Sequence, residues 1–176
     1  MNKEIPLLVF NVVSKFFKSI IVVCEKRKEN LIRKILGKVK TISLEKFSFK
    51  RAMDRVKKVL KKDFYFLVSS NMPFLMEKTV REILVRFDGK SDCICYFWSL
   101  KNFEKFCAIY SRRFLPNFRA CKRKILVPIG KETYEFFKVN TQEDLKEAKE
   151  ILRSKWGRRF LMSIKAIKRP CKKRKK

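Results

Sequence analysis

Histidine is absent from the 176-residue chain, and its six cysteines form no CxxC pair. Zinc sites need histidine or closely paired cysteine ligands, so the sequence argues against one. Cys93 and Cys95 lie two residues apart, which on a strand places both on one face. We therefore predict small buried side chains there rather than a redox or metal centre, and reduced thiols fit a cytoplasmic location.

Long apolar runs are also lacking. The longest, such as "SIIVVC" at 19–24, fall far short of the ~20 residues that span a bilayer. The N-terminal segment has Glu4 before its apolar stretch and Lys15 after it, with no small-residue cleavage site. We therefore expect no membrane association and no signal peptide.

Acidic residues are few: 17 Asp and Glu stand against 46 Lys and Arg, a formal net charge of +29. Such a field attracts polyanions, whether nucleic acid, anionic lipid or nucleoside triphosphates. The basic residues are spread over every segment, and no strand resembles the KGFGFVxF-like signature of RNA-binding domains. We do not expect dedicated nucleic-acid binding, although the charge leaves it open.

Apolar strands alternate with amphipathic helices, which favours an α/β sheet with helices on its faces. The length fits one domain. The strands we expect lie at 19–25, 64–69, 93–98 and 132–137, and the helices include 6–17, 49–60, 75–87 and 142–152. Ser48 is suited to cap the helix at 49–60, and Thr141 with Asp144 forms the pattern of a capping box before the helix at 142–152.

In doubly wound sheets the ligand lies beyond the carboxyl ends of the strands. Asn71 occupies such a position in "FLVSSNMPFL" (66–75), directly after the strand at 64–69. Many nucleotidyltransferases place an acid there to hold the Mg²⁺ of a nucleoside triphosphate, followed by a proline that stiffens the turn. The chemistry calls for a hard oxygen ligand because Mg²⁺ offsets the charge that builds up as pyrophosphate leaves.

Three segments together carry a resemblance to a family. They are "FYFLVSSNMPFLMEKTVREIL" (64–84), "AIYSRRFLP" (108–116) and "FFKVNTQEDLKEAKEIL" (136–152). In this order they resemble the molybdenum cofactor guanylyltransferases, the MobA-like members of the nucleotidyltransferase superfamily. The likeness covers nearly the whole chain to about residue 152.

The resemblance implies a three-layer, Rossmann-like, mostly parallel sheet of the nucleotide-diphospho-sugar transferase type. The domain would span 1–152, followed by a basic C-terminal extension at 153–176. The implied reaction transfers GMP from GTP to molybdopterin bearing molybdenum, with Mg²⁺ as cofactor. Carried over residue by residue, Lys3 would contact the nucleotide phosphates, Asn71 would stand at the metal position, and Asn140 would help to bind the acceptor.

The same resemblance exposes departures. The family opens with a strand and a glycine-rich phosphate loop, and "MNKEIPLL" matches only the end of that motif. Without that strand its neighbours in the sheet would have unpaired edges. Either the coding sequence starts upstream or the gene has decayed. The base-binding segment would fall at 45–55, which lacks glycine and proline.

Two substitutions weaken the site itself. Asn71 replaces the metal-holding Asp, and Lys138 replaces the first Asn of the family's Asn-x-Asn pair, of which Asn140 remains. We therefore expect little or no activity from the chain as it stands. Two alternatives stay open: cytidylyl transfer to the same acceptor, and a non-catalytic basic protein that binds nucleic acid on the same fold.

Overall fold

The computed structural model describes residues 4–99, 102–115, 117–130 and 133–167. Its helices are α1 (Glu4–Val13), α2 (Lys26–Leu36), α3 (Phe49–Val59), α4 (Glu77–Val85), α5 (Gln142–Arg153) and α6 (Lys155–Ile167), with a short 3₁₀ helix η1 (Phe118–Ala120). Its strands are β1 (Ile21–Glu25), β2 (Lys40–Leu44), β3 (Phe64–Val68), β4 (Cys93–Ser99), β5 (Asn102–Ser111) and β6 (Lys124–Pro128).

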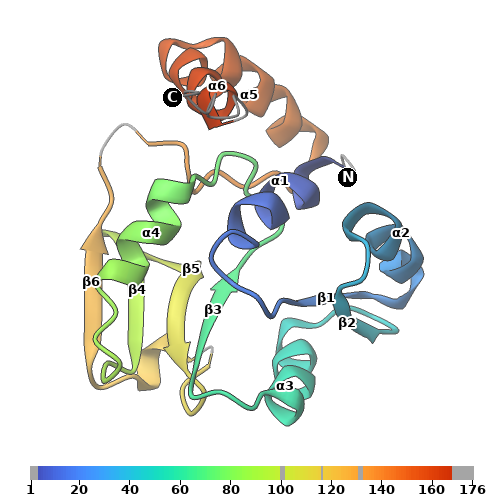
Figure 1. Cartoon of the computed structure of the whole chain (residues 1–176), viewed down its shortest axis with the longest axis vertical. Coiled ribbons are helices and arrows are strands. Elements are labelled where there is room, and N and C mark those ends of the chain that lie inside the picture. The colour runs from blue at the N-terminus through green and yellow to red at the C-terminus, as the bar shows by residue number, and fades with distance from the viewer. Residues whose placement is uncertain (1–3, 100–101, 116, 131–132, 168–176) are drawn as a thin grey trace, which may run out of the picture.

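Within these residues the strands form two sheets (Figure 1). One is the parallel pair β1-β2, and the other has the order β3-β5-β4-β6. β5 runs antiparallel to both β3 and β4, while β4 and β6 are parallel, so β3, β4 and β6 share one direction. The strands are therefore mostly parallel, with one reversed strand.

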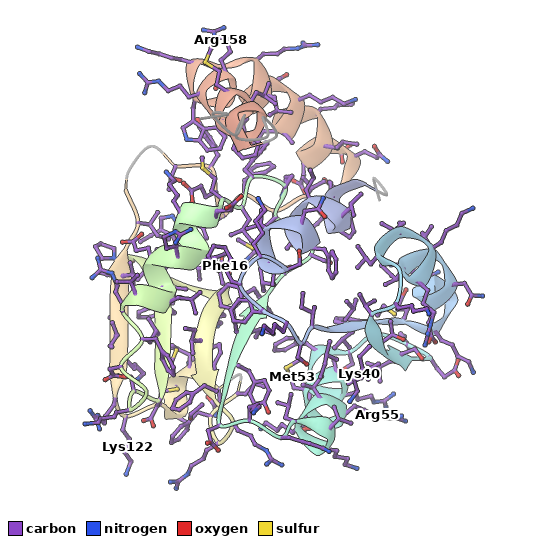
Figure 2. All side chains as sticks on the ribbon, in the orientation of Figure 1. Phe16, Lys40, Met53, Arg55, Lys122 and Arg158 are labelled. Atoms are coloured by element: carbon purple, nitrogen blue, oxygen red, sulfur yellow. The ribbon has the colours of Figure 1, made fainter. Side chains whose placement is uncertain are left out.

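Helices cover both faces of the strands, because alternate strand residues point to opposite sides. On one face α1 and α4 contribute Val9, Val80 and Ile83 to a cluster with Ile94 and Val127. On the other face α3 and η1 pack on the alternate strand residues. Figure 2 shows Met53 on the side of α3 that faces the strands and Arg55 pointing away from them. The predicted α/β class and its three layers are confirmed.

The two sheets meet at β1 and β3, which do not pair with each other. Among the described residues β1 pairs only with β2, and β3 pairs only with β5. All five residues of β3 are partly exposed. β1 and β3 therefore each have one unpaired edge within the described part of the chain.

α5 and α6, shown in orange and red in Figure 1, pack together beyond the carboxyl end of β3. Their cluster contains Phe74, Val139, Ile151 and Phe160, with the Trp156 ring packed edge-on against Phe74. Residues 155–167, which we expected in a basic extension, thus form a helix that packs on the fold. Residues 168–176 lie outside the described part of the chain.

Most element predictions agree with the structure, but one strand was misplaced. The expected strand at 132–137 is wrong: over the described residues 133–137 the chain has no strand, and Phe137 N–H donates to the Tyr134 carbonyl in a turn. The strand lies earlier, at β6. Cys93 and Cys95 are buried and unbridged, as predicted. In the described residues no helix is long and apolar enough to cross a membrane.

Candidate functional site

The turn after β3 brings Asn71 to the carboxyl end of the strand. Ser69 N–H donates to the Phe106 carbonyl on β5 at 2.9 Å, which extends the ladder by one residue. Beyond it, Met72 and Phe74 are 0% and 2% exposed. These buried side chains anchor the turn in the core, and Asn71 is left half-buried at the surface of the turn.

Asn71 contacts Asn140, the other described residue that the sequence assigned to the site. The Asn71 Nδ2 group donates to Asn140 Oδ1 at 2.6 Å, and the Ser69 hydroxyl donates to Asn71 Oδ1. The backbone adds a bond from Val139 N–H to the Asn71 carbonyl at 2.9 Å. Two side chains 69 residues apart in sequence therefore meet at one edge of the sheet.

The start of α5 holds Asn140 in place. Thr141 and Asp144 form the predicted capping box, with Asp144 N–H donating to Thr141 Oγ1 at 3.1 Å. The Asp144 carboxylate accepts from the backbone N–H of Asn140 at 2.7 Å and from that of Thr141 at 2.9 Å. These N–H groups lower the pKa of Asp144 below its ordinary value. The Asp144 carboxylate thus caps the N-terminus of α5 and is bound to backbone N–H groups.

Glu104 and Lys138 form an ion pair beside these asparagines that the sequence did not predict. The Lys138 ammonium donates to Glu104 Oε1 at 2.9 Å and to Oε2 at 2.8 Å. Glu104 is 2% exposed and also accepts from Phe106 N–H at 2.8 Å. The only sequence signal was an acid within the apolar segment that forms β5.

The register of the sheet places this pair near Asn71. Val68 lies opposite Cys107, and β5 runs antiparallel to β3, so Glu104 extends past the end of β3 alongside the Asn71 turn. Lys138 precedes Asn140 by two residues. The carboxyl end of β3 therefore carries two amides, one ammonium and one carboxylate.

Asn71 was predicted to hold Mg²⁺, so the oxygen atoms at this end of β3 must be suited to that ion. A hard cation takes oxygen ligands and binds best where carboxylates supply charge. Here Asn71 Oδ1 accepts from Ser69, Asn140 Oδ1 accepts from Asn71, and both Glu104 oxygens accept from Lys138. No group of three or more His, Cys, Asp or Glu in the described ranges is placed to hold a metal. As arranged, these residues do not fit a dedicated Mg²⁺ site.

Lys3, the predicted phosphate contact, lies outside the described residues. The segment 45–55, where the resemblance places base binding, borders a basic hollow of about 480 Å³ between the end of β2 and α3. Arg51, Arg55 and Lys58 line it from α3. Glu45 and Asp54 line it as well, and Glu45 pairs with Lys26 of α2 at 2.6 Å. This hollow offers cations to an anion but no glycine or proline turn for a base.

Comparison with known proteins gives the fold. No protein-family model and no curated protein matches the chain. Among solved structures it is similar to molybdopterin-guanine dinucleotide biosynthesis protein A from Archaeoglobus fulgidus, at 18% identity over 83% of this chain and 85% of that one, with a TM-score of 0.58. It is also similar to 4-diphosphocytidyl-2C-methyl-D-erythritol synthase from Anaerococcus prevotii, at 15% identity over 85% and 89% of the chains, TM-score 0.64.

A third similar structure is CMP:2-keto-3-deoxy-manno-octonic acid synthetase complexed with CTP, at 12% identity over 85% and 87% of the chains, TM-score 0.61. At these identities the likeness establishes the shared architecture and not the reaction. The chain has the α/β fold of these solved structures.

Proposed function

We propose that this chain is a nucleotidyltransferase that binds a nucleoside triphosphate at the carboxyl end of β3. The observation that carries the proposal is the hydrogen bond between Asn71 and Asn140, which joins the two described residues that the family resemblance assigned to one site. The fold of the similar solved structures supports it, since a ligand at the carboxyl ends of the strands is the rule for open α/β sheets.

The specific reaction follows from the resemblance. GMP would pass from GTP to molybdopterin bearing molybdenum: an oxygen of the pterin phosphate attacks the α-phosphorus of GTP, the bond to the β-phosphate breaks, and pyrophosphate leaves. In this scheme the amide groups of Asn71 and Asn140 contact the triphosphate, and Asn140 also helps to position the acceptor phosphate. Lys3 would contact the triphosphate. The cations around the site stabilise the charge that develops on the leaving pyrophosphate.

Turnover by residues 1–176 should be slow or undetectable. The glycine-rich loop that the resemblance calls for, whose backbone amides cradle a triphosphate, is not among these residues. Asn71 also stands where the family has an acid. Binding of the triphosphate is therefore the more sensitive test of the proposal, and product formation is the second.

The experiment pairs both readouts with matched variants. Binding of GTP to the full chain would be measured by calorimetry, and the pyrophosphate and dinucleotide products would be measured with molybdenum-bearing molybdopterin as acceptor. Asn71→Ala and Asn140→Ala should weaken GTP binding by about tenfold, the value of one or two lost hydrogen bonds to a charged ligand. Asn30→Ala, in exposed α2, is the control. Equal binding by all four proteins would contradict the site.

Cytidylyl transfer is a second candidate, because two of the similar structures are named for CMP or diphosphocytidyl products. The segment 45–55 has no feature that selects guanine. Parallel titrations with GTP and CTP decide between the two, and preference is expressed as the ratio of the dissociation constants. A ratio near one would assign no base selectivity to this chain.

A non-catalytic role in nucleic-acid binding is favoured by the basic hollow beside α3. Such binding would weaken steeply as salt is raised, because phosphate contacts release counterions. Fluorescence anisotropy with a labelled single-stranded RNA at low and physiological salt tests it. Arg51→Glu with Arg55→Glu should abolish the signal if the hollow is the binding surface.

A further inference from the structure

Lys138 pairs with a buried carboxylate beside the candidate site. Its ammonium is held between the two oxygens of Glu104 at 2.9 and 2.8 Å, and that carboxylate is almost fully shielded, with its side chain 3% exposed. Burying a lone carboxylate is costly, so it needs a cation beside it. In this chain that cation is the ammonium group of Lys138.

The backbone directs this cation to the candidate site. Val139 is buried, 5% exposed, and its N–H donates to the Asn71 carbonyl. Lys138 and Asn140 are the two sequence neighbours of Val139, so this backbone bond anchors both of them beside the Asn71 turn. Asn140 reaches Asn71, and Lys138 reaches Glu104 beside the same turn.

The ammonium has capacity for an additional ligand. It has three N–H donors, of which two are directed at Glu104. Its side chain is 29% exposed, so an anion in solution can reach it. Glu104 keeps its place when the ammonium is shared, because Phe106 N–H also donates to it at 2.8 Å.

We propose that Lys138 is the built-in cation of this site, and that it binds the phosphate groups of a nucleotide in place of a divalent metal ion. The site therefore binds a triphosphate without Mg²⁺. The proposal rests on the proposed function only in taking a nucleotide as the source of the phosphate. It accounts for the donor set at Asn71 and Asn140, where the amide oxygens are already satisfied and no carboxylate is free.

The first test measures binding of GTP and of tripolyphosphate, which has no base, to the full chain in EDTA and in Mg²⁺. Wild-type protein should bind both probes with similar dissociation constants in the two buffers. Lys138→Met should weaken binding by about tenfold or more, as expected for a charge-assisted bond, and Lys138→Arg should retain most of it.

Lys78 supplies the matched control. It also pairs with a buried carboxylate, Glu135, at 2.8 Å, in an ion pair that does not include Glu104 or either site asparagine. Lys78→Met removes the same charge from the same kind of pair and should leave tripolyphosphate binding within about twofold of wild type. Equal weakening by Lys78→Met and Lys138→Met would assign the effect to net charge and overturn the proposal.

A second test covers the case in which Lys138→Met does not fold because Glu104 is left unpaired. Lys138→Met combined with Glu104→Gln removes both charges and keeps an acceptor for Phe106 N–H. This double variant should fold and should still bind tripolyphosphate at least about tenfold more weakly than wild type. Binding restored to the wild-type level would show that the ammonium is not the contact.

A third test uses Mn²⁺ as a spectroscopic probe of the freed carboxylate. Lys138→Asn exposes Glu104 to solvent and should bind Mn²⁺ more tightly than wild type by electron paramagnetic resonance, an effect that Glu104→Gln should remove. Triphosphate binding that requires Mg²⁺ in wild type would overturn this inference alone. Metal-independent GTP binding that depends on Lys138 but is unchanged in Asn71→Ala and Asn140→Ala would overturn only the proposed function.

Discussion

Replacing Gly157 with alanine tests how α5 and α6 hold the candidate site together. The chain turns from one helix into the next at Ser154, whose Oγ donates to the Ile151 carbonyl at 2.6 Å and accepts from Gly157 N–H at 3.1 Å. This tight turn brings the first residues of α6 against the end of α5. A methyl group on Gly157 would overlap the Ile151 carbonyl oxygen and the backbone of Leu152.

The two physical effects of this substitution have opposite signs. Alanine stabilises a helix by up to about 1 kcal/mol relative to glycine. The overlap is with backbone atoms, which cannot rotate away, so α6 must move off α5. Overpacking of this kind costs about 1 to 3 kcal/mol. Part of the contact between Trp156, Phe160 and Phe74 is lost as well, so we expect the free energy of unfolding to fall by about 2 kcal/mol in total.

Urea denaturation followed by circular dichroism measures this difference. Gly130→Ala is the control, because nothing lies within 4 Å of a Cβ at that position and its φ is not positive. Gly130→Ala should be neutral or slightly stabilising. If Gly157→Ala is as stable as that control, or more so, helix propensity has prevailed and the close packing of α5 on α6 is refuted.

Lys138→Met should lower the free energy of unfolding by about 3 kcal/mol or more, because it leaves Glu104 buried without a partner, and adding Glu104→Gln should recover most of that loss in the same urea assay. Acid should destabilise the fold through Glu29 and Asp88, whose pKa values are both lowered to about 2, chiefly by the side chain of Arg33 for Glu29 and by neighbouring backbone N–H groups for Asp88. Their stabilisation is complete above their ordinary pKa values of 4.5 and 3.8 and is lost as the pH falls toward 2. Glu29→Gln with Asp88→Asn should therefore reduce the fall of the melting temperature with pH between these limits. Scanning calorimetry at several pH values measures this fall, and the same fall in the variant as in wild type would contradict this account.

Local patterns predicted the elements whose signals lie within a few residues. Three features could be predicted because each depends only on residues close in sequence. They are the capping box at Thr141 and Asp144, the β-branched run of β1 and the apolar stripe of α3. Ser48 occupies the N-cap position of α3 as predicted, although its side chain makes no capping bond.

The misplaced strand shows where such signals end. Residues 133–137 are aromatic enough to indicate a strand, yet Phe136 is buried by packing on Tyr96 and Trp98 without any ladder. Glu135 is buried beside Lys78. The true strand, β6, is defined by its parallel pairing with β4, which no local pattern records.

The site was half predictable for the same reason. Asn71 was proposed because it follows a strand, and Asn140 because the family resemblance implies it, but their contact depends on the path of the whole chain. Glu104 and Lys138 are 34 residues apart and carry no local mark of their pairing. A lysine at 138 looks like one more surface cation in a chain of net charge +29 until the buried carboxylate beneath it is known.

The division between β1 and β3 connects the fold to the expected low turnover. A continuous apolar run such as "FYFLV" in β3 is typical of a strand with neighbours on both sides and both faces covered. Among the described residues β3 has one neighbour, and its side chains are left partly exposed. The family resemblance implies a strand in the middle of the sheet that continues into a glycine-rich phosphate loop, and residues 1–176 contain no such loop. Under the proposed function, the phosphate contact among the described residues therefore falls to a cation beside the end of β3, such as Lys138, and not to the backbone amides of a loop.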